Sequence, residues 1–306
     1  MLRFYVLTSR KFGCLKRHFR SLPKAQTTVV INSTDDVYIA KAYEWCREEG
    51  IDVTITESNG KPGKGKNSVL QHFLASECEY MVQIDGDDFL QPHGVNVYNW
   101  VSENNPPDGI QLVYGNTWSD HSNPAELYGV HPWRKNYLNW VKDTFPLEKR
   151  GHYYHMYERR EEYFKTFREI DKQAFKWNYP DAVAPTECAR LIFYSRKLAE
   201  LVKFREDLLI GEDALVNYQV RDMDWNKEIT LKKILDSREK TYSYDLNNSG
   251  IVKQTERESN YEWLQPFHDA VDEASKNWTV PQDFSLHEIK HNIEKVPYIE
   301  DLGVEQ

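Results

Sequence analysis

The chain has 306 residues, which is long enough for one large domain or for a domain with an extension. Its composition, with 40% hydrophobic and 28% charged residues, is typical of a soluble globular protein. The net charge of -9 argues against a protein that binds duplex nucleic acid, because such proteins need a basic surface.

The cysteines and the hydropathy pattern indicate the compartment in which the protein is expected. The four cysteines, Cys14, Cys46, Cys78 and Cys188, lie far apart, and none has the spacing of a zinc site. We expect free thiols in a reducing compartment. The first residues do not have the pattern of a signal peptide, and no apolar run has the length of a membrane span. We therefore expect a cytoplasmic protein without a transmembrane segment.

Strand and helix patterns alternate in the first part of the chain. Short apolar runs typical of strands lie at 4–8, 28–31, 51–56, 80–84 and 110–114. Helical patterns separate them at 13–22, 37–49, 68–76 and 92–103. This order predicts a parallel α/β sheet with helices on both faces. In such sheets ligands bind at the carboxyl ends of the strands, where we expect the loops 32–36, 60–67 and 85–88.

The strand at 80–84 leads into the most informative motif, Asp85-Gly86-Asp87-Asp88. A buried strand that carries carboxylates at its carboxyl end suits a hard divalent cation, because Mg²⁺ and Mn²⁺ prefer oxygen ligands. Gly86 allows the backbone to turn and to approach a ligand closely. The alternative is an acidic turn without a ligand, since Asp and Gly are common turn residues.

The regular alternation stops between residues 118 and 185. Tryptophan and histidine are frequent in this segment, and 157–175 has the pattern of one amphipathic helix. We interpret the segment as an insertion that shapes a second pocket; the alternative is a small satellite core. The candidate residues of this second pocket are Trp118, Asp120, His131, Trp133, His152, His155 and Trp177.

Regular patterns return after the insertion. Strands are predicted at 189–195, 229–235 and 240–244, and a helix at 196–202. The segment 207–213 opens a second helix that continues to about residue 221. The chain after 252 is polar, with helical periods at 261–274 and 286–293, and we expect a helical C-terminal extension.

Two alternatives concern the glycine-rich segment and the aromatic residues. Gly60 to Lys66 fits the pattern of a phosphate-binding loop, G-x-x-x-x-G-K, which would indicate a kinase or nucleotide hydrolase. Asn67 stands where that motif needs Ser or Thr, and Pro62 removes a backbone N–H donor. A non-catalytic carbohydrate-binding protein would account for the aromatic residues but not for the acidic motifs.

Several motifs, in this order and spacing, resemble the family 2 type glycosyltransferases of the GT-A fold. Asp85-Gly86-Asp87-Asp88 matches the DxD motif of that family. Residues 32–36 resemble the loop after the family's second strand, and residues 63–67 resemble its Gly…Arg/Lys-Asn element. Residues 211–213 resemble its late Glu-Asp motif, and residues 242–251 resemble the tail that covers the donor phosphates. The chain departs from the family at Asn32, where an acidic residue is usual, and in the tail, which lacks the common His.

The resemblance implies a GT-A (Rossmann-like) fold, with a mixed, mainly parallel sheet flanked by helices. The glycosyltransferase domain would span 1–252, with the insertion at 118–185 and the extension at 253–306. The implied reaction is metal-dependent transfer of a hexose, with inversion, from a nucleotide-diphosphate sugar to an acceptor hydroxyl. A UDP-sugar is the expected donor, Mn²⁺ or Mg²⁺ the expected metal, and a carbohydrate or glycoconjugate the expected acceptor.

The resemblance also implies roles for individual residues. Asp87 and Asp85 would hold the metal, and Asp88 the metal or the donor sugar. Asp213 would be the general base, with Glu212 as second candidate; the alternative is that both only cap a helix. The candidates near the nucleobase are Thr8, Ser9, Arg10, Asn32 and Asp35, and Gly86 in the acidic motif is a further donor-binding candidate. The candidates near the diphosphate are Gly63, Lys64 and Lys66. The alternative for the two lysines is that they lie in a solvated loop.

Overall fold

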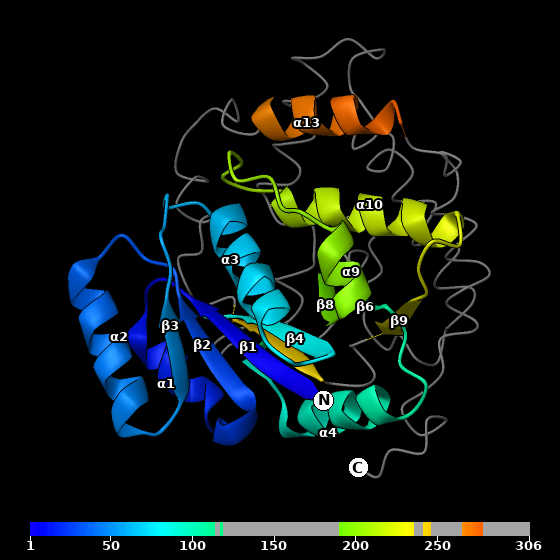
Figure 1. Cartoon of the computed structure of the whole chain (residues 1–306). Coiled ribbons are helices and arrows are strands. Elements are labelled where there is room, and N and C mark those ends of the chain that lie inside the picture. Colours follow the sequence, from blue (N-terminus) through cyan, green and yellow to red (C-terminus); the bar gives the residue numbers. More distant parts are fainter. Residues whose placement is uncertain (114–116, 119–189, 236–240, 246–264, 278–306) are drawn as a thin grey trace.

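The structure is a computed structural model, and it describes residues 1–113, 117–118, 190–235, 241–245 and 265–277 (Figure 1). The predicted helix at 157–175 and nearly all of the predicted insertion lie outside these residues. So do the helical period at 286–293 and most of the tail at 242–251.

A mixed sheet of seven strands forms the centre of the described part, in the order β3-β2-β1-β4-β8-β6-β9. β1, β2, β3 and β4 run parallel to one another, and β8 runs antiparallel to both of its neighbours, β4 and β6. The sheet is thus mainly parallel, as predicted. However, β8, which comes later in the chain, lies between β4 and β6. The strands are β1 (Leu2–Thr8), β2 (Thr27–Ile31), β3 (Asp52–Ile55), β4 (Tyr80–Asp85), β6 (Gly109–Val113), β8 (Arg190–Ser195) and β9 (Leu231–Leu235).

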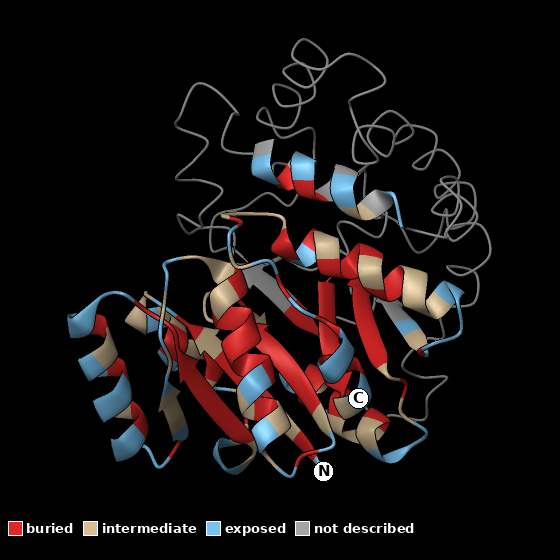
Figure 2. Ribbon diagram, turned by 45° about the horizontal axis from the view of Figure 1, so that its top comes forward, coloured by how far each residue is buried: buried red, intermediate tan, exposed pale blue. Residues whose placement is uncertain are grey.

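Helices cover both faces of the sheet because the strands bury side chains on both sides. In β1, Phe4 and Val6 belong to one buried cluster and Tyr5 to the other, which is the alternation expected of a strand. The first cluster includes α1 (Phe12–His18), α2 (Asp36–Glu48) and α4 (Pro92–Glu103). The second includes α3 (Pro62–Ala75), α9 (Arg196–Leu201) and α10 (Glu212–Trp225). Figure 2 shows the buried strands between these helices, with the outer face of α2 exposed.

The start of α3 corrects the predicted loop at 60–67. The helix begins at Pro62 and not at Ser68, so Gly63 to Asn67 form its first turns. Pro62 suits this position because the first helical residue needs no hydrogen-bonded N–H and has the backbone angle that proline fixes. A phosphate-binding loop needs several non-helical residues before its helix, and here only Gly60 and Lys61 of the pattern precede α3.

The remaining described elements lie around the edges of the main sheet. β5 (Phe89–Leu90), β10 (Tyr242–Asp245) and β7 (Thr117–Trp118) form a second sheet of three strands, so the predicted last strand does not join the main sheet. A short 3-10 helix covers Lys24–Gln26. α13 (Gln265–Ser275), in the predicted extension, packs on α10 through Phe267 and Ala270 (Figure 1).

In the part of the chain that the structure describes, no helix combines the length and the apolar character needed to cross a bilayer.

Candidate functional site

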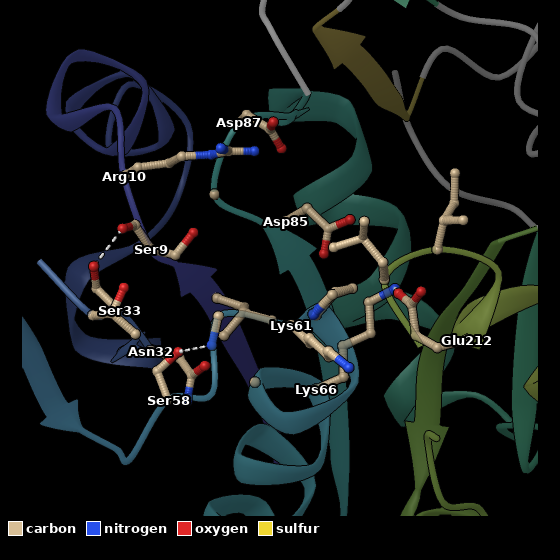
Figure 3. Close-up of a pocket in the computed structure, with 18 of the residues that line it drawn as sticks. Ser9, Arg10, Asn32, Ser33, Ser58, Lys61, Lys66, Asp85, Asp87 and Glu212 are labelled. Atoms are coloured by element: carbon tan, nitrogen blue, oxygen red, sulfur yellow. Dashed lines mark hydrogen bonds and ion pairs between the residues drawn. The ribbon is translucent and has the colours of Figure 1, made fainter. Parts of the chain in front are cut away.

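A pocket of about 640 Å³ opens at the carboxyl ends of β1, β2, β3 and β4, opposite the start of α10 (Figure 3). This is the edge of the sheet at which ligands were predicted to bind. Nine of the predicted site residues line the pocket: Ser9, Arg10, Asn32, Lys66, Asp85, Gly86, Asp87, Glu212 and Asp213. They come from five separate stretches of the chain, which the parallel sheet brings to one edge.

Thr8 and Asp35 lie outside the pocket lining and have local partners. The hydroxyl of Thr8 is buried and hydrogen-bonded to the hydroxyl of Tyr38. Asp35 caps α2, since its carboxylate accepts hydrogen bonds from the N–H groups of Val37 at 3.0 Å and Tyr38 at 3.1 Å.

Gly63 and Lys64 also lie outside the pocket lining. A Cβ atom on Gly63 would lie 2.0 Å from the main-chain oxygen of Arg205, so this glycine allows α3 to contact the 203–208 segment. Lys64 forms an ion pair with Glu206 at 3.7 Å. Asn67 bonds to both main-chain groups of Phe204, at 2.9 Å each. These residues therefore anchor α3 to the 203–208 segment.

Asp85 and Asp88 share one buried cation, the guanidinium of Arg190, which no sequence motif indicates. Arg190, at the start of β8, donates from Nη1 to Asp85 Oδ2 at 2.6 Å and to Asp88 Oδ2 at 3.2 Å. The hydroxyl of Tyr242 donates to the same oxygen of Asp88 at 2.7 Å, so Asp88 is enclosed and does not line the pocket. Burial and the neighbouring Asp87 raise the pKa of Asp88. Burial also opposes the charge of Asp85, but Arg190 and Lys66 outweigh it and hold the pKa of Asp85 low.

Asp87 is the most accessible carboxylate of the motif, and its side chain is 36% exposed. Its Oδ2 atom lies 3.6 Å from Lys11 Nζ. The backbone of the turn is held from α1, because Arg17 donates to the main-chain oxygen of Asp87 at 2.7 Å. His18 Nε2 lies 3.1 Å from the main-chain oxygen of Gly86. The carboxylate of Asp87 thus extends into the pocket from a fixed turn.

Lys66 and Glu212 form a buried ion pair between α3 and α10, with Nζ and Oε1 2.7 Å apart. Burial would lower the pKa of Lys66, but the carboxylates of Glu212 and Asp213 outweigh it and raise that pKa, so the amine is protonated. Asp213 Oδ2 lies 3.8 Å from the same nitrogen, yet the Asp213 side chain is 51% exposed. Both neighbouring acids line the pocket, and Asp213 is the more accessible of the two.

The acidic residues of the pocket fit a divalent cation bound in part by substrate. Among the described residues, no three His, Cys, Asp or Glu side chains converge on a metal position. Asp87 and Asp85 both line the pocket, and Mg²⁺ is commonly held by one or two carboxylates together with substrate phosphates and water. The oxygen donors present suit that arrangement better than a site closed by protein ligands alone.

Some pocket residues lie outside every motif selected from the sequence, namely Lys11, Ser58, Leu209 and Ile210. Ser33, Thr34, Lys61, Gly65 and Gly211 lie within the predicted loops and motifs but were not selected individually. Asn32 and Ser58 lie on the same side of the pocket in Figure 3. Asn32 joins the ends of β2 and β3, because its amide donates to Thr56 Oγ1 at 2.8 Å and to the main-chain oxygen of Glu57 at 2.9 Å. Of the residues that fit the phosphate-loop pattern, 60–62, Gly65 and Lys66 line the pocket, and Gly63 and Lys64 do not.

No family model and no curated protein matches the sequence. Among solved structures, the chain is similar to residues 1–349 of TarS from S. aureus in complex with UDP-GlcNAc, with a TM-score of 0.51 and 13% identity over 94% of this chain and 70% of that chain. It is also similar to the mannosyltransferase PcManGT from Pyrobaculum calidifontis in complex with GDP-Man and Mn²⁺, with a TM-score of 0.50 and 14% identity over 96% of this chain and 69% of that chain. At these identities the similarity shows the fold, and it agrees with the predicted GT-A arrangement.

Proposed function

We propose that the protein is a glycosyltransferase that moves a hexose from a nucleotide-diphosphate sugar to an acceptor hydroxyl. The observation that carries this proposal is one pocket that Asp85, Asp87 and Asp213 all line, at the carboxyl edge of a GT-A sheet. Four basic residues, Arg10, Lys11, Lys61 and Lys66, line the same pocket. Carboxylates for a cation, basic groups for a diphosphate and a separate exposed acid are the parts that this reaction needs.

A uridine-diphosphate hexose is the proposed donor and Mn²⁺ or Mg²⁺ the proposed metal. One structural neighbour was solved with UDP-GlcNAc and the other with GDP-Man and Mn²⁺, which supports a sugar nucleotide in this fold. Asp87, with Asp85, would hold the metal, which when bound supplies positive charge to the diphosphate. Ser9, Asn32 and Ser58 line the part of the pocket proposed for the nucleobase.

Asp213 is the proposed general base. The acceptor oxygen bonds to the anomeric carbon while the bond from that carbon to the β-phosphate oxygen breaks. The electron pair of that bond leaves with the nucleoside diphosphate, and Asp213 takes the proton of the acceptor hydroxyl. Such a single displacement inverts the anomeric centre. Glu212 is already paired with Lys66, so we assign it a positioning role at the start of α10.

The test is turnover of a donor panel with substitutions that keep size and remove charge. The 306-residue protein is incubated with UDP-, GDP- and dTDP-sugars, with and without Mn²⁺, and release of the nucleoside diphosphate is followed. We expect metal-dependent turnover of one donor, at least about 100-fold slower in Asp213→Asn with donor binding retained. Asp87→Asn should weaken donor binding in the presence of Mn²⁺.

Asp36→Asn is the matched control, since Asp36 is exposed on the first turn of α2 and does not line the pocket. It should behave like the wild type. Failure of the wild type to bind any sugar nucleotide, or unchanged turnover in both pocket variants, would refute the proposed function.

A further inference from the structure

The four basic side chains of the pocket differ in whether their N–H groups are already hydrogen-bonded to oxygen atoms of the protein. Lys66 Nζ donates to Glu212 Oε1 at 2.7 Å, in a pair that is almost fully buried. Lys61 Nζ donates to the main-chain oxygen of Asp207 at 2.7 Å. Both amines are therefore held in place by partners within the protein, and a ligand would have to compete for them.

Lys11 is different because its ammonium group lacks such a partner. Its Nζ atom is shielded from solvent and has no hydrogen bond among the described residues. The nearest carboxylate oxygen, Asp87 Oδ2, is 3.6 Å away, which is longer than an N–H···O hydrogen bond. Leaving a buried charge without hydrogen bonds is unfavourable. An anion that enters the pocket beside Lys11 would accept the unused N–H groups.

Arg10 adds a second cation at the same place. It directly precedes Lys11 after the end of β1, lines the pocket, and extends toward Asp87 in Figure 3. Among the described residues, Arg10 makes no hydrogen bond or ion pair. The end of β1 therefore presents two positive groups whose donors are not committed, next to the carboxylate proposed to hold the metal.

We propose that Lys11, with Arg10 beside it, binds the diphosphate of the donor and neutralises the charge that develops on it as the sugar leaves. This inference rests on the proposed function and assigns the diphosphate to residues other than Lys64 and Lys66, which the family resemblance implied. Lys64 is paired with Glu206 outside the pocket, and Lys66 is paired with Glu212. Arg10 then contacts phosphate oxygens and not the nucleobase.

The experiment compares the affinity for a nucleoside diphosphate with that for the nucleoside alone. Binding of UDP in the presence of Mn²⁺ is measured by calorimetry, and binding of uridine by ligand-observed NMR; GDP and guanosine replace them if the wild type prefers GDP. We expect Lys11→Met to weaken UDP binding by about 10- to 100-fold, as for loss of a charged hydrogen bond, and to leave uridine binding unchanged. Lys11→Arg should retain most of the affinity.

Lys64→Met is the matched control, because it makes the same substitution of a lysine that is paired with Glu206 outside the pocket lining. It should bind both ligands like the wild type. Thermal unfolding without nucleotide verifies that the variants are folded. If Lys11→Met binds UDP as tightly as the wild type, this inference is wrong while the proposed function stands. If the wild type binds none of UDP, GDP and dTDP, both are wrong.

Discussion

His18 shows how one buried side chain supports the site. Its ring is completely buried below the acidic turn, and its Nε2 atom contacts the main-chain oxygen of Gly86. Burial lowers the pKa of His18 to about 4; Arg17 acts in the same direction, while the contact with Gly86 and the charge of Asp85 oppose it. Near neutral pH the ring is therefore uncharged and can donate to the Gly86 oxygen.

We predict that His18 makes the folded state sensitive to acid. The unfolded chain binds a proton at His18 near pH 6.5, whereas the folded chain binds it only near pH 4, so stability is lost as the pH falls through this interval. Between pH 7 and pH 5 the wild type should lose about 2 kcal/mol more of its free energy of unfolding than His18→Gln does. Urea unfolding at both pH values measures this difference, and equal losses in the two proteins would contradict it.

The sequence predicts which residues line the pocket where a motif is local, and it does not predict a partner that is distant in the chain. Asp85 and Asp87 line the pocket as expected from the strand that ends beside them, and Asp213 could be selected because 211–213 resembles the late Glu-Asp motif of the glycosyltransferases. Arg190 could not, because its role depends on β8 lying next to β4 in the opposite direction, which no local pattern encodes. For the same reason, Asp88 looked like a ligand although Arg190 and Tyr242 enclose it.

At the scale of elements, the contact between α3 and the 203–208 segment depends on Gly63. We predict that Gly63→Ala lowers the free energy of unfolding by about 1–3 kcal/mol, because the added Cβ would lie 2.0 Å from the Arg205 oxygen and one backbone must move. Gly13→Ala in α1 is the matched control. Gly13 is exposed with no atom within 4 Å of an added Cβ, so the change should stabilise by up to about 1 kcal/mol.

Chemical denaturation of the two alanine variants tests this pair directly. Opposite signs are expected although both substitutions replace a helical glycine. A stabilised Gly63→Ala protein would mean that the contact between α3 and the 203–208 segment is looser than the structure shows.

The elements themselves were largely predictable, and the exceptions have identifiable causes. Helix α4 begins and ends at the predicted residues, because Pro92 starts it and an amphipathic pattern continues to Glu103. The start of α3 was predicted too late, since its two glycines and two lysines, at 63–66, have the composition of a loop. They are helical because tertiary contacts, such as Asn67 to Phe204 and Lys66 to Glu212, outweigh that local preference.

At the scale of the whole molecule, α13 lies in the extension predicted at 253–306 and contacts the domain predicted at 1–252. Phe267 is buried in a cluster with Leu208, Ala214 and Tyr218 from the α10 region. Its ring also covers Gly211, where an added Cβ would lie 2.3 Å from the ring. Gly211 has a φ of +85° and directly precedes Glu212 and Asp213. Part of the extension thus supports the turn that begins the catalytic helix proposed here.

We predict that Phe267→Ala destabilises the protein as one unit and weakens donor binding. Removing a buried phenylalanine costs about 3–5 kcal/mol, and the loss should appear as a shift of a single unfolding transition if α13 and the main sheet unfold together. Calorimetry with and without UDP measures both effects. Val37→Ala is the control, because Val37 is 78% exposed and its truncation should change stability by less than about 0.5 kcal/mol. Two separate transitions, with only the first moved by Phe267→Ala, would instead show that the extension is an independent unit, and unchanged UDP binding would show that the pocket does not depend on it.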